Sequence, residues 1–236
     1  MKKTLKDSID GLENIFYSDI YQGSIVIVYG PPGSLKSGMV YSVMSNYLQK
    51  SGEFGMYLTV EENTISHLRN MDSLGISIPE NLLISDYSDI RSRFEGPAGA
   101  DHPDFLEMVD GVIKFFKDKE GDNFTTFGLD SLGGLYSLID GSNLRAKMFH
   151  FFKKLREYNL TSFIIMETPR FSNIIEGQGS EMFLADGIIE MGPIEHQHDI
   201  HLYMQVIKMR SCHHSRKKHL IDIGESGISI LSPVVN

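Results

Sequence analysis

The chain has 236 residues, of which 41% are hydrophobic, and this composition excludes a disordered chain and favours one large α/β domain over residues 1–236. Its formal net charge of −9 argues against a nucleic-acid surface over the whole chain, and no apolar run approaches the ~20 residues that cross a bilayer. The charged N-terminal stretch lacks the apolar segment of a secretory signal, and the single cysteine, Cys212, cannot form an internal disulfide, so we expect a cytoplasmic protein.

In chain order, the first predicted elements surround a glycine-rich turn. A short helix is expected at about 12–18, and the β-branched run 25–28 predicts a strand that is buried on both faces. The turn GPPGSLKS follows at 30–37, and apolar residues at three- and four-residue spacing predict an amphipathic helix over 38–49. A strand, a glycine-rich turn and a Lys-Ser pair that opens a helix form the layout of a phosphate-binding loop.

Such a loop binds phosphate for a physical reason. Unpaired backbone N–H groups at the turn and at the start of the helix point toward one spot, where the helix dipole favours an anion. Lys36 is expected to reach the outer phosphates, and the hydroxyl of Ser37 is expected to bind Mg²⁺. An ordinary strand–turn–helix with a chance Lys-Ser pair is the alternative. The predicted nucleotide-binding residues are Gly30, Pro31, Pro32, Gly33, Ser34, Leu35, Lys36, Ser37 and Gly38.

The residue before the lysine departs from the usual pattern. Loops of the form G-x-x-x-x-G-K-[ST] have a glycine there, whereas this chain has Leu35. A side chain at that position is expected to crowd the phosphates or to force a different backbone angle. Leu35 therefore argues against tight binding or fast turnover.

Two adjacent carboxylates, Glu61 and Glu62, follow the second predicted strand at 54–60. Ligands of open α/β sheets lie at the carboxyl ends of the strands, so this pair is a candidate to face the nucleotide. If the strand continues, the two side chains point in opposite directions and one of them faces the ligand. A solvated acidic start to the next predicted helix, 63–74, is the alternative.

A third acid follows a later strand. The pattern predicts a strand at 82–86, a surface loop at 87–103, a helix from about 104 to 117, and a strand at 124–129 that leads into Asp130. An acid at the tip of such a strand, well after a phosphate loop, suits a Walker B aspartate that holds Mg²⁺ directly or through water. A turn-starting aspartate is the alternative.

The remaining pattern sets the fold class. A helix is expected at 144–158, a strand at 161–166, a loop at 170–182, and strands at 187–191, 202–208, 220–223 and 228–231. Strands and helices alternate first, and a run of strands follows. This order predicts an α/β fold with a mostly parallel central sheet, flanked by helices and extended by antiparallel strands at the C-terminal end.

Two clusters near the C-terminus have competing interpretations. The tract 208–219 holds five basic residues and no acid, which indicates a solvated hairpin turn or, as an alternative, a DNA contact. Close histidines suggest a zinc site, although no cysteine pair accompanies them and strand alternation would scatter several to opposite faces. These histidines are His196, His198, His201, His213, His214 and His219.

Taken together, the ordered motifs resemble those of the KaiC-like branch of the RecA superfamily, over nearly the whole chain. The similar segments are GLE at 11–13, GS at 23–24, GPPGSLKS at 30–37, VEE at 60–62, LDS at 129–131, ADGII at 185–189, KMRSCHH at 208–214 and GISIL at 227–231. The resemblance implies a RecA-like P-loop NTPase fold, ATP and Mg²⁺ as ligands, and a homo-oligomeric ring, such as a hexamer, with nucleotide between subunits.

The resemblance also implies roles for particular residues. Glu62, with Glu61 beside it, matches the glutamate that positions or deprotonates the attacking water. Lys208 and Arg210 match the basic pair that reaches the phosphates bound by a neighbouring subunit. Alternate residues of a strand point the same way, so these two cations can meet one target. Ser37 and Asp130 match the residues that hold Mg²⁺.

Three functions follow from this resemblance. The first is slow Mg²⁺-dependent ATP hydrolysis used as a regulatory or assembly switch. The second is a nucleotide sensor or scaffold that binds ATP without hydrolysing it and assembles with a partner protein. Leu35 favours this second function. The third is an accessory protein for DNA recombination, which the acidic net charge makes the least favoured.

Overall fold

The computed structural model describes residues 4–94, 104–139, 143–168, 180–196, 198–224 and 227–234. Within these residues, nine strands form one sheet in the order β3-β2-β4-β5-β1-β6-β7-β8-β9. Their bounds are β1 Ile25–Gly30, β2 Phe54–Thr59, β3 Leu82–Asp86, β4 Phe124–Asp130, β5 Thr161–Glu167, β6 Gly187–His196, β7 Asp199–Met209, β8 His219–Gly224 and β9 Gly227–Pro233.

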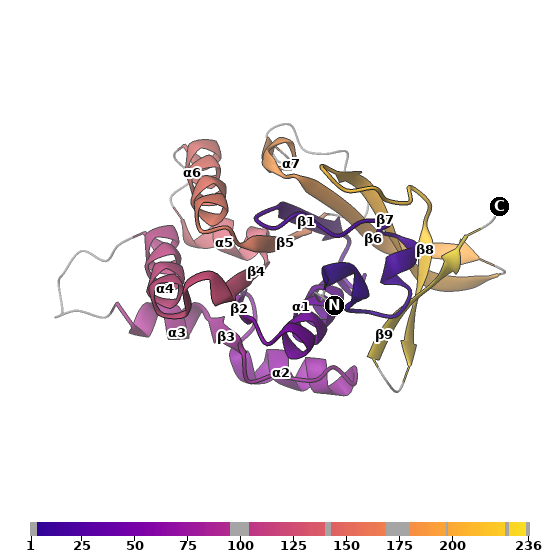
Figure 1. Ribbon diagram of the computed structural model, residues 1–236, viewed down its shortest axis with the longest axis horizontal. Coiled ribbons are helices and arrows are strands. Elements are labelled where there is room, and N and C mark those ends of the chain that lie inside the picture. The colour runs from indigo at the N-terminus through magenta and orange to yellow at the C-terminus, as the bar shows by residue number, and fades with distance from the viewer. Residues whose placement is uncertain are drawn as a thin grey trace.

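The sheet has a parallel part and an antiparallel part. Neighbouring strands from β3 across to β6 run parallel, whereas β6 to β9 pair as successive antiparallel hairpins. In Figure 1 these antiparallel strands lie at one end of the molecule, and helices α4 and α6 lie at the other. The predicted fold class is confirmed, and the antiparallel strands extend the sheet beyond β1.

Helices cover both faces of the parallel part. Helices α1 and α2 pack into one apolar cluster with residues from β9, while α4, α5 and α6 pack into a second cluster on the opposite face. The helix bounds are α1 Lys36–Ser51, α2 Thr64–Ser73, α3 Tyr87–Ser92, α4 Phe105–Glu120, α5 Leu132–Leu138, α6 Leu144–Glu157 and α7 Ser180–Leu184, with 3₁₀ turns η1 Leu5–Asp7, η2 Leu12–Asn14 and η3 Gly121–Asn123.

Two local expectations were wrong, and one helix was not predicted. The helix at 12–18 is only the 3₁₀ turn η2, because Phe16 leaves the helical path to form a β-bridge with His214. The loop expected at 87–103 begins with helix α3, which Asp86 and Asp89 start through a reciprocal capping box, and the rest of that loop, from 95, lies outside the described residues. Helix α5 was not predicted, and the Ser131 side chain caps it by accepting from the Gly134 N–H.

The C-terminal segments are longer than their sequence pattern indicated. Strands β6 and β7 extend almost to each other and form a long hairpin, whereas strands were expected only at 187–191 and 202–208. Of the loop expected at 170–182, residues 170–179 lie outside the described residues and α7 begins at Ser180. No helix in the described part of the chain is long and apolar enough to cross a bilayer.

Candidate functional site

The loop between β1 and α1 has the backbone shape of an anion cup. A Cβ at Gly30 would lie 1.9 Å from the Met191 carbonyl oxygen, so only glycine lets the chain pass there. Gly33 has φ +78°, in the left-handed region that glycine adopts easily. Helix α1 then starts at Lys36, so its first free N–H groups face the loop. The backbone of this loop thus has the glycine conformations and the helix start that the sequence pattern predicted.

Leu35 has the backbone conformation that is usual for glycine at this position of the loop. It has φ 66° and ψ 22°, the left-handed conformation that a glycine would adopt before the lysine. Its side chain packs against the apolar core, and terminal methyl groups of Leu35, Leu74 and Ile228 lie around Gly38. A Cβ at Gly38 would lie 2.9 to 3.4 Å from the terminal methyl groups of these three residues. From this placement we infer that the Leu35 side chain leaves the phosphate position open.

The Lys36 ammonium lies inside the loop. Its Nζ donates to the Pro31 carbonyl oxygen at 2.9 Å, and it lies 3.5 Å from Oε1 of Glu167, which ends β5. The residue is only 5% exposed, and this burial lowers the pKa of Lys36, an effect that the Glu167 carboxylate opposes. The ammonium is a buried cation at the point where phosphate oxygens would enter.

Ser37 and Asp130 come together at the carboxyl ends of the strands. The Ser37 hydroxyl lies near the Asp130 carboxylate, and the Tyr57 hydroxyl donates to Oδ2 of Asp130 at 2.9 Å. Burial raises the pKa of Asp130, the two hydroxyls oppose this effect, and the nearby charges of Glu61 and Glu62 raise it further. A hydroxyl and a carboxylate are hard oxygen donors of the kind that Mg²⁺ prefers, so these residues fit a magnesium site.

Glu61 and Glu62 do not alternate on a strand as expected, because β2 ends at Thr59 and the chain turns. The turn is fixed by Thr59, whose hydroxyl donates to the Glu62 carbonyl oxygen at 3.1 Å and lies 3.3 Å from the Glu62 N–H. Glu61 accepts a short hydrogen bond from the Ser131 hydroxyl, and its charge acts on both Lys36 and Asp130. Glu61 is therefore the carboxylate turned toward the phosphate loop.

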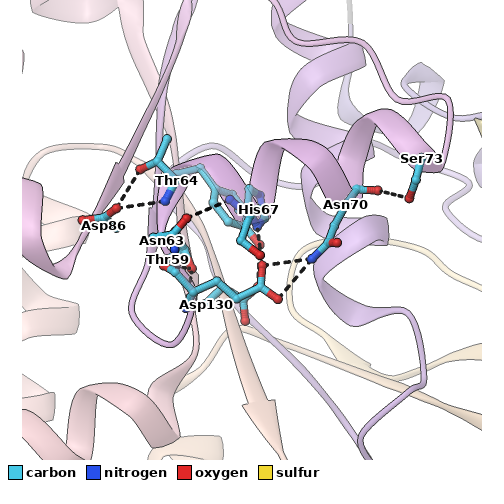
Figure 2. A network of polar contacts seen from close by, with 11 residues as sticks. Thr59, Asn63, Thr64, His67, Asn70, Ser73, Asp86 and Asp130 are labelled. Atoms are coloured by element: carbon cyan, nitrogen blue, oxygen red, sulfur yellow. Dashed lines mark hydrogen bonds and ion pairs between the residues drawn. The ribbon is translucent and has the colours of Figure 1, made fainter.

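Glu62 is held by helix α2. Its two carboxylate oxygens accept from Nδ2 of Asn70 at 3.2 Å each, and Nδ1 of His67 lies 3.9 Å from its Oε2. Figure 2 shows His67 and Asn70 one turn apart on α2, pointing toward the same carboxylate, with Asp130 close by. The start of α2 is fixed in turn by Asp86, which accepts from both the N–H and the hydroxyl of Thr64.

A cluster of buried polar aromatic residues lies behind these acids, and sequence reasoning missed it. The His67 ring stacks on Tyr57 with centroids 4.8 Å apart, and Tyr41 meets both rings edge-on at 5.3 and 5.4 Å. Burial lowers the pKa of His67 to about 4, so its ring is neutral, and burial raises the pKa of Tyr57 well above its usual value, so its hydroxyl remains a donor. The three residues are far apart in the sequence and each resembles ordinary core material there.

Lys208 and Arg210 lie together, with a third cation that was not predicted. Nζ of Lys208 donates to the Ala185 carbonyl oxygen at 2.6 Å, and Nη1 of Arg210 lies 3.3 Å from Oδ1 of Asp186. Oδ2 of the same aspartate accepts from Arg156 at 3.0 Å. Burial and the neighbouring Arg210 charge both lower the pKa of Lys208. We call Arg156, Lys208 and Arg210 the cation cluster.

The cation cluster and the phosphate loop lie at opposite ends of strand β1. The Arg210 N–H donates to the Asp186 carbonyl oxygen, and the Asp186 N–H donates to that of Ile25, at the start of β1. The loop follows Gly30 at the other end of this strand, and a rise of about 3.3 Å per residue separates the two ends by about 16 Å. The structure therefore brings Lys36, Ser37, Asp130 and Glu61 together but leaves Lys208 and Arg210 apart from them.

The C-terminal histidines that the structure describes form no metal-binding group. Within the described residues, no group of three or more His, Cys, Asp or Glu side chains could hold a metal ion. His219 is buried, and its Nε2 lies 3.0 Å from the Ser215 hydroxyl. The side chain of His196 lies outside the described part. In the basic tract, the Lys218 ammonium lies 4.0 Å from the centre of the Tyr203 ring, and Arg216 and Lys217 are exposed.

Comparisons with known proteins show the family of this chain. The family model "ATPase: KaiC" matches residues 5–235. The circadian clock oscillator protein KaiC of Parathermosynechococcus lividus is 23% identical over 228 residues, which cover 94% of this chain and 41% of that protein. A "UPF0273 protein" of Thermotoga maritima is 25% identical over 240 residues, which cover 98% of this chain and 96% of that protein.

A solved structure shares the fold. The crystal structure of a KaiC-like protein from Pyrococcus horikoshii superimposes with a TM-score of 0.76 and 22% identity, over 98% of this chain and 100% of that chain. The chain thus spans less than half the length of the KaiC relative and nearly the full length of the shorter relative from Thermotoga maritima. With the family model matching almost every residue, the chain belongs to the KaiC family of ATPases.

Proposed function

We propose that this protein binds ATP with Mg²⁺ at the loop between β1 and α1 and hydrolyses it slowly, as a regulatory or assembly switch. The observation that carries the proposal is the convergence of Lys36, Ser37, Asp130 and Glu61 at the carboxyl edge of the parallel strands. That edge is where open α/β sheets bind their ligands. A buried cation, a pair of hard oxygen donors and a nearby carboxylate are groups that assist phosphoryl transfer to water.

Each group has a role in this proposal. The loop N–H groups and Lys36 bind the phosphates, and the ammonium exchanges the Pro31 carbonyl oxygen for a phosphate oxygen. Ser37 and Asp130 would hold Mg²⁺, which supplies positive charge against the phosphates. The neutral loop amides and Lys36 stabilise the charge that spreads over the transferred group.

Glu61 is the better placed of the two candidate groups for handling water. Glu61 is bound by Ser131, which directly follows Asp130, and its charge acts on Lys36, whereas Glu62 is held by Asn70 of helix α2. A carboxylate beside the phosphate site can orient the attacking water and accept its proton. The sequence favoured Glu62, so the two variants Glu61→Gln and Glu62→Gln are a direct comparison.

The site is tested by calorimetry and turnover on the same preparations. Wild-type protein is expected to bind Mg-ATP and to release phosphate slowly. Lys36→Ala is expected to lose binding, because the buried cation is removed, whereas Glu61→Gln is expected to bind and to lose turnover about 100-fold or more. Folded protein that gives no heat with Mg-ATP would refute the proposal, and turnover that survives Glu61→Gln but not Glu62→Gln would reverse the two roles.

The cation cluster supports a shared site between copies of this chain. Lys208 and Arg210 lie near the start of β1, at the opposite end of that strand from their own loop, which supports the proposal that they act on a nucleotide held by another copy. We propose a head-to-tail homo-oligomer, in the form of a ring, with nucleotide at each subunit interface. Asp186 holds Arg156 and Arg210 in place through its two oxygens.

Mixing separate variants tests this sharing. Arg210→Ala and Lys36→Ala are each expected to be inactive, but a mixture of the two should regain turnover, because one subunit supplies an intact loop and its neighbour an intact Arg210. Arg216→Ala, a change to an exposed arginine in the connection between β7 and β8, is the control and should remain active. A mixture that stays inactive while both variants still assemble would contradict a shared site.

The alternative of a nucleotide sensor that does not hydrolyse ATP relied on Leu35. Because Leu35 has the backbone conformation of a glycine and packs its side chain onto Leu74 and Ile228, the geometry gives that alternative no steric support. A different observation favours it in part. The Glu167 carboxylate, 3.5 Å from the Lys36 ammonium, adds negative charge beside the position that an outer phosphate would occupy. The Glu167→Gln variant tests whether this charge weakens ATP binding.

A further inference from the structure

One buried group at the edge of the site has no role in the proposed reaction. Tyr57, in the middle of β2, is 0% exposed, and its hydroxyl donates to Oδ2 of Asp130 at 2.9 Å. The hydroxyl of Tyr41, which is equally buried and only one ring away, has no hydrogen-bond partner in the described structure. Two tyrosines of one cluster thus differ in whether their hydroxyl contacts the carboxylate of the metal site.

The Tyr57 ring is fixed from both sides. His67 stacks on it with an angle of 27° between the ring planes, and Tyr41 meets it edge-on at 76°. His67 also contacts Glu62 through Nδ1, at 3.9 Å. One rigid aromatic unit therefore connects helix α2 and the Glu61–Glu62 turn with the carboxylate at the end of β4.

We propose that Tyr57 is a positioning residue for the magnesium site. By donating to one oxygen of Asp130, it fixes the plane of the carboxylate so that the second oxygen is directed to a cation bound at Ser37. His67 acts through Tyr57 by fixing the ring. This inference rests on the proposed function, because it concerns the Mg²⁺ that accompanies ATP. A hydrogen bond between a neutral donor and a charged acceptor is strong enough to make such positioning measurable.

Tyr57→Phe removes the hydroxyl and keeps the ring, and Tyr41→Phe is its matched control. Binding of a fluorescent ATP analogue would be titrated with Mg²⁺ and, separately, measured with EDTA present. For Tyr57→Phe we expect the Mg²⁺ concentration that gives half of the Mg²⁺-dependent change in analogue binding to rise about tenfold. The affinity for the analogue without Mg²⁺ should stay unchanged. For Tyr41→Phe we expect both quantities to equal those of the wild type, because no hydrogen bond is lost.

The outcomes separate this inference from the proposed function. If wild-type protein shows no Mg²⁺-dependent binding, the proposed function fails and this inference falls with it. If the wild type responds to Mg²⁺ and Tyr57→Phe responds at the same concentration, only the inference is overturned. An equal loss in Tyr41→Phe would also overturn it, because the effect would then come from packing of the cluster. Thermal melting of each variant shows whether packing has changed, and the comparison with and without Mg²⁺ holds for any variant that folds.

Discussion

The left-handed conformation of Leu35 can be measured through the stability of two substitutions. A non-glycine residue in this conformation costs about 1–2 kcal/mol, part of which is offset by the greater entropy that glycine loses on folding. The half-buried Leu35 side chain contributes about 1 kcal/mol of burial against Leu74 and Ile228, roughly half of the value for a fully buried leucine. Leu35→Ala loses this packing and keeps the strain, whereas Leu35→Gly loses the packing and relieves the strain.

We therefore expect Leu35→Gly to be more stable than Leu35→Ala by about 1 kcal/mol in urea unfolding. Gln49, an exposed residue within α1, provides the control, because there Ala is expected to be more stable than Gly by about 1 kcal/mol. The order of the two substitutions should thus reverse between the two positions. If Leu35→Ala is as stable as Leu35→Gly, the assigned backbone conformation is wrong, and so is the conclusion that Leu35 leaves the phosphate position open.

Two further predictions concern charges near the site. Burial lowers the pKa of His67 from 6.5 to about 4, so the folded protein favours the neutral ring. This preference contributes about 3 kcal/mol to the free energy of unfolding above pH 6.5, and the contribution is lost as the pH falls toward 4. Urea unfolding at about pH 7 and about pH 4.5 should show a smaller acid loss in His67→Phe, and an equal loss would contradict this. Glu167→Gln removes the negative charge beside Lys36, where the outer phosphate of ATP is expected. Calorimetry should therefore show a gain in affinity for ATP that exceeds any gain for ADP. Equal gains would mean that Glu167 does not compete with the outer phosphate.

The sequence predicted those parts of the fold whose residues are close together in the chain. The β-branched run before Gly30 and the helical spacing after Lys36 predicted the strand and the helix on either side of the loop. The acids that follow β2 and end β4 predicted which carboxylates lie near it. The order of alternating elements followed by strands was sufficient to predict a parallel sheet with an antiparallel extension.

The short helices were missed although local signals for them exist. Asp86 and Asp89 form a capping box before α3, but the polar and glycine-rich residues after it suggested a loop. Ser131 is an N-cap for α5, but Gly133 and Gly134 in its first turn are poor helix formers and concealed it.

The finer features of the site depend on contacts between distant segments. The sequence pattern implied that Leu35 would disturb the loop, because its packing against Leu74 and Ile228 cannot be read from neighbouring residues. The same reason hid the contact of Tyr57 with Asp130, which are 73 positions apart. The choice between Glu61 and Glu62 depended on where β2 ends, a boundary that sequence patterns define poorly.

The opposite positions of the phosphate loop and the cation cluster affect how copies of this chain can assemble. Copies that join one edge to the other stack head to tail, through an interface that is different on its two sides. An open row of such copies always ends with one loop that has no cluster beside it and one cluster that has no loop. Only a closed circle supplies a cluster to every loop, so closure itself would give each molecule in the assembly the same environment.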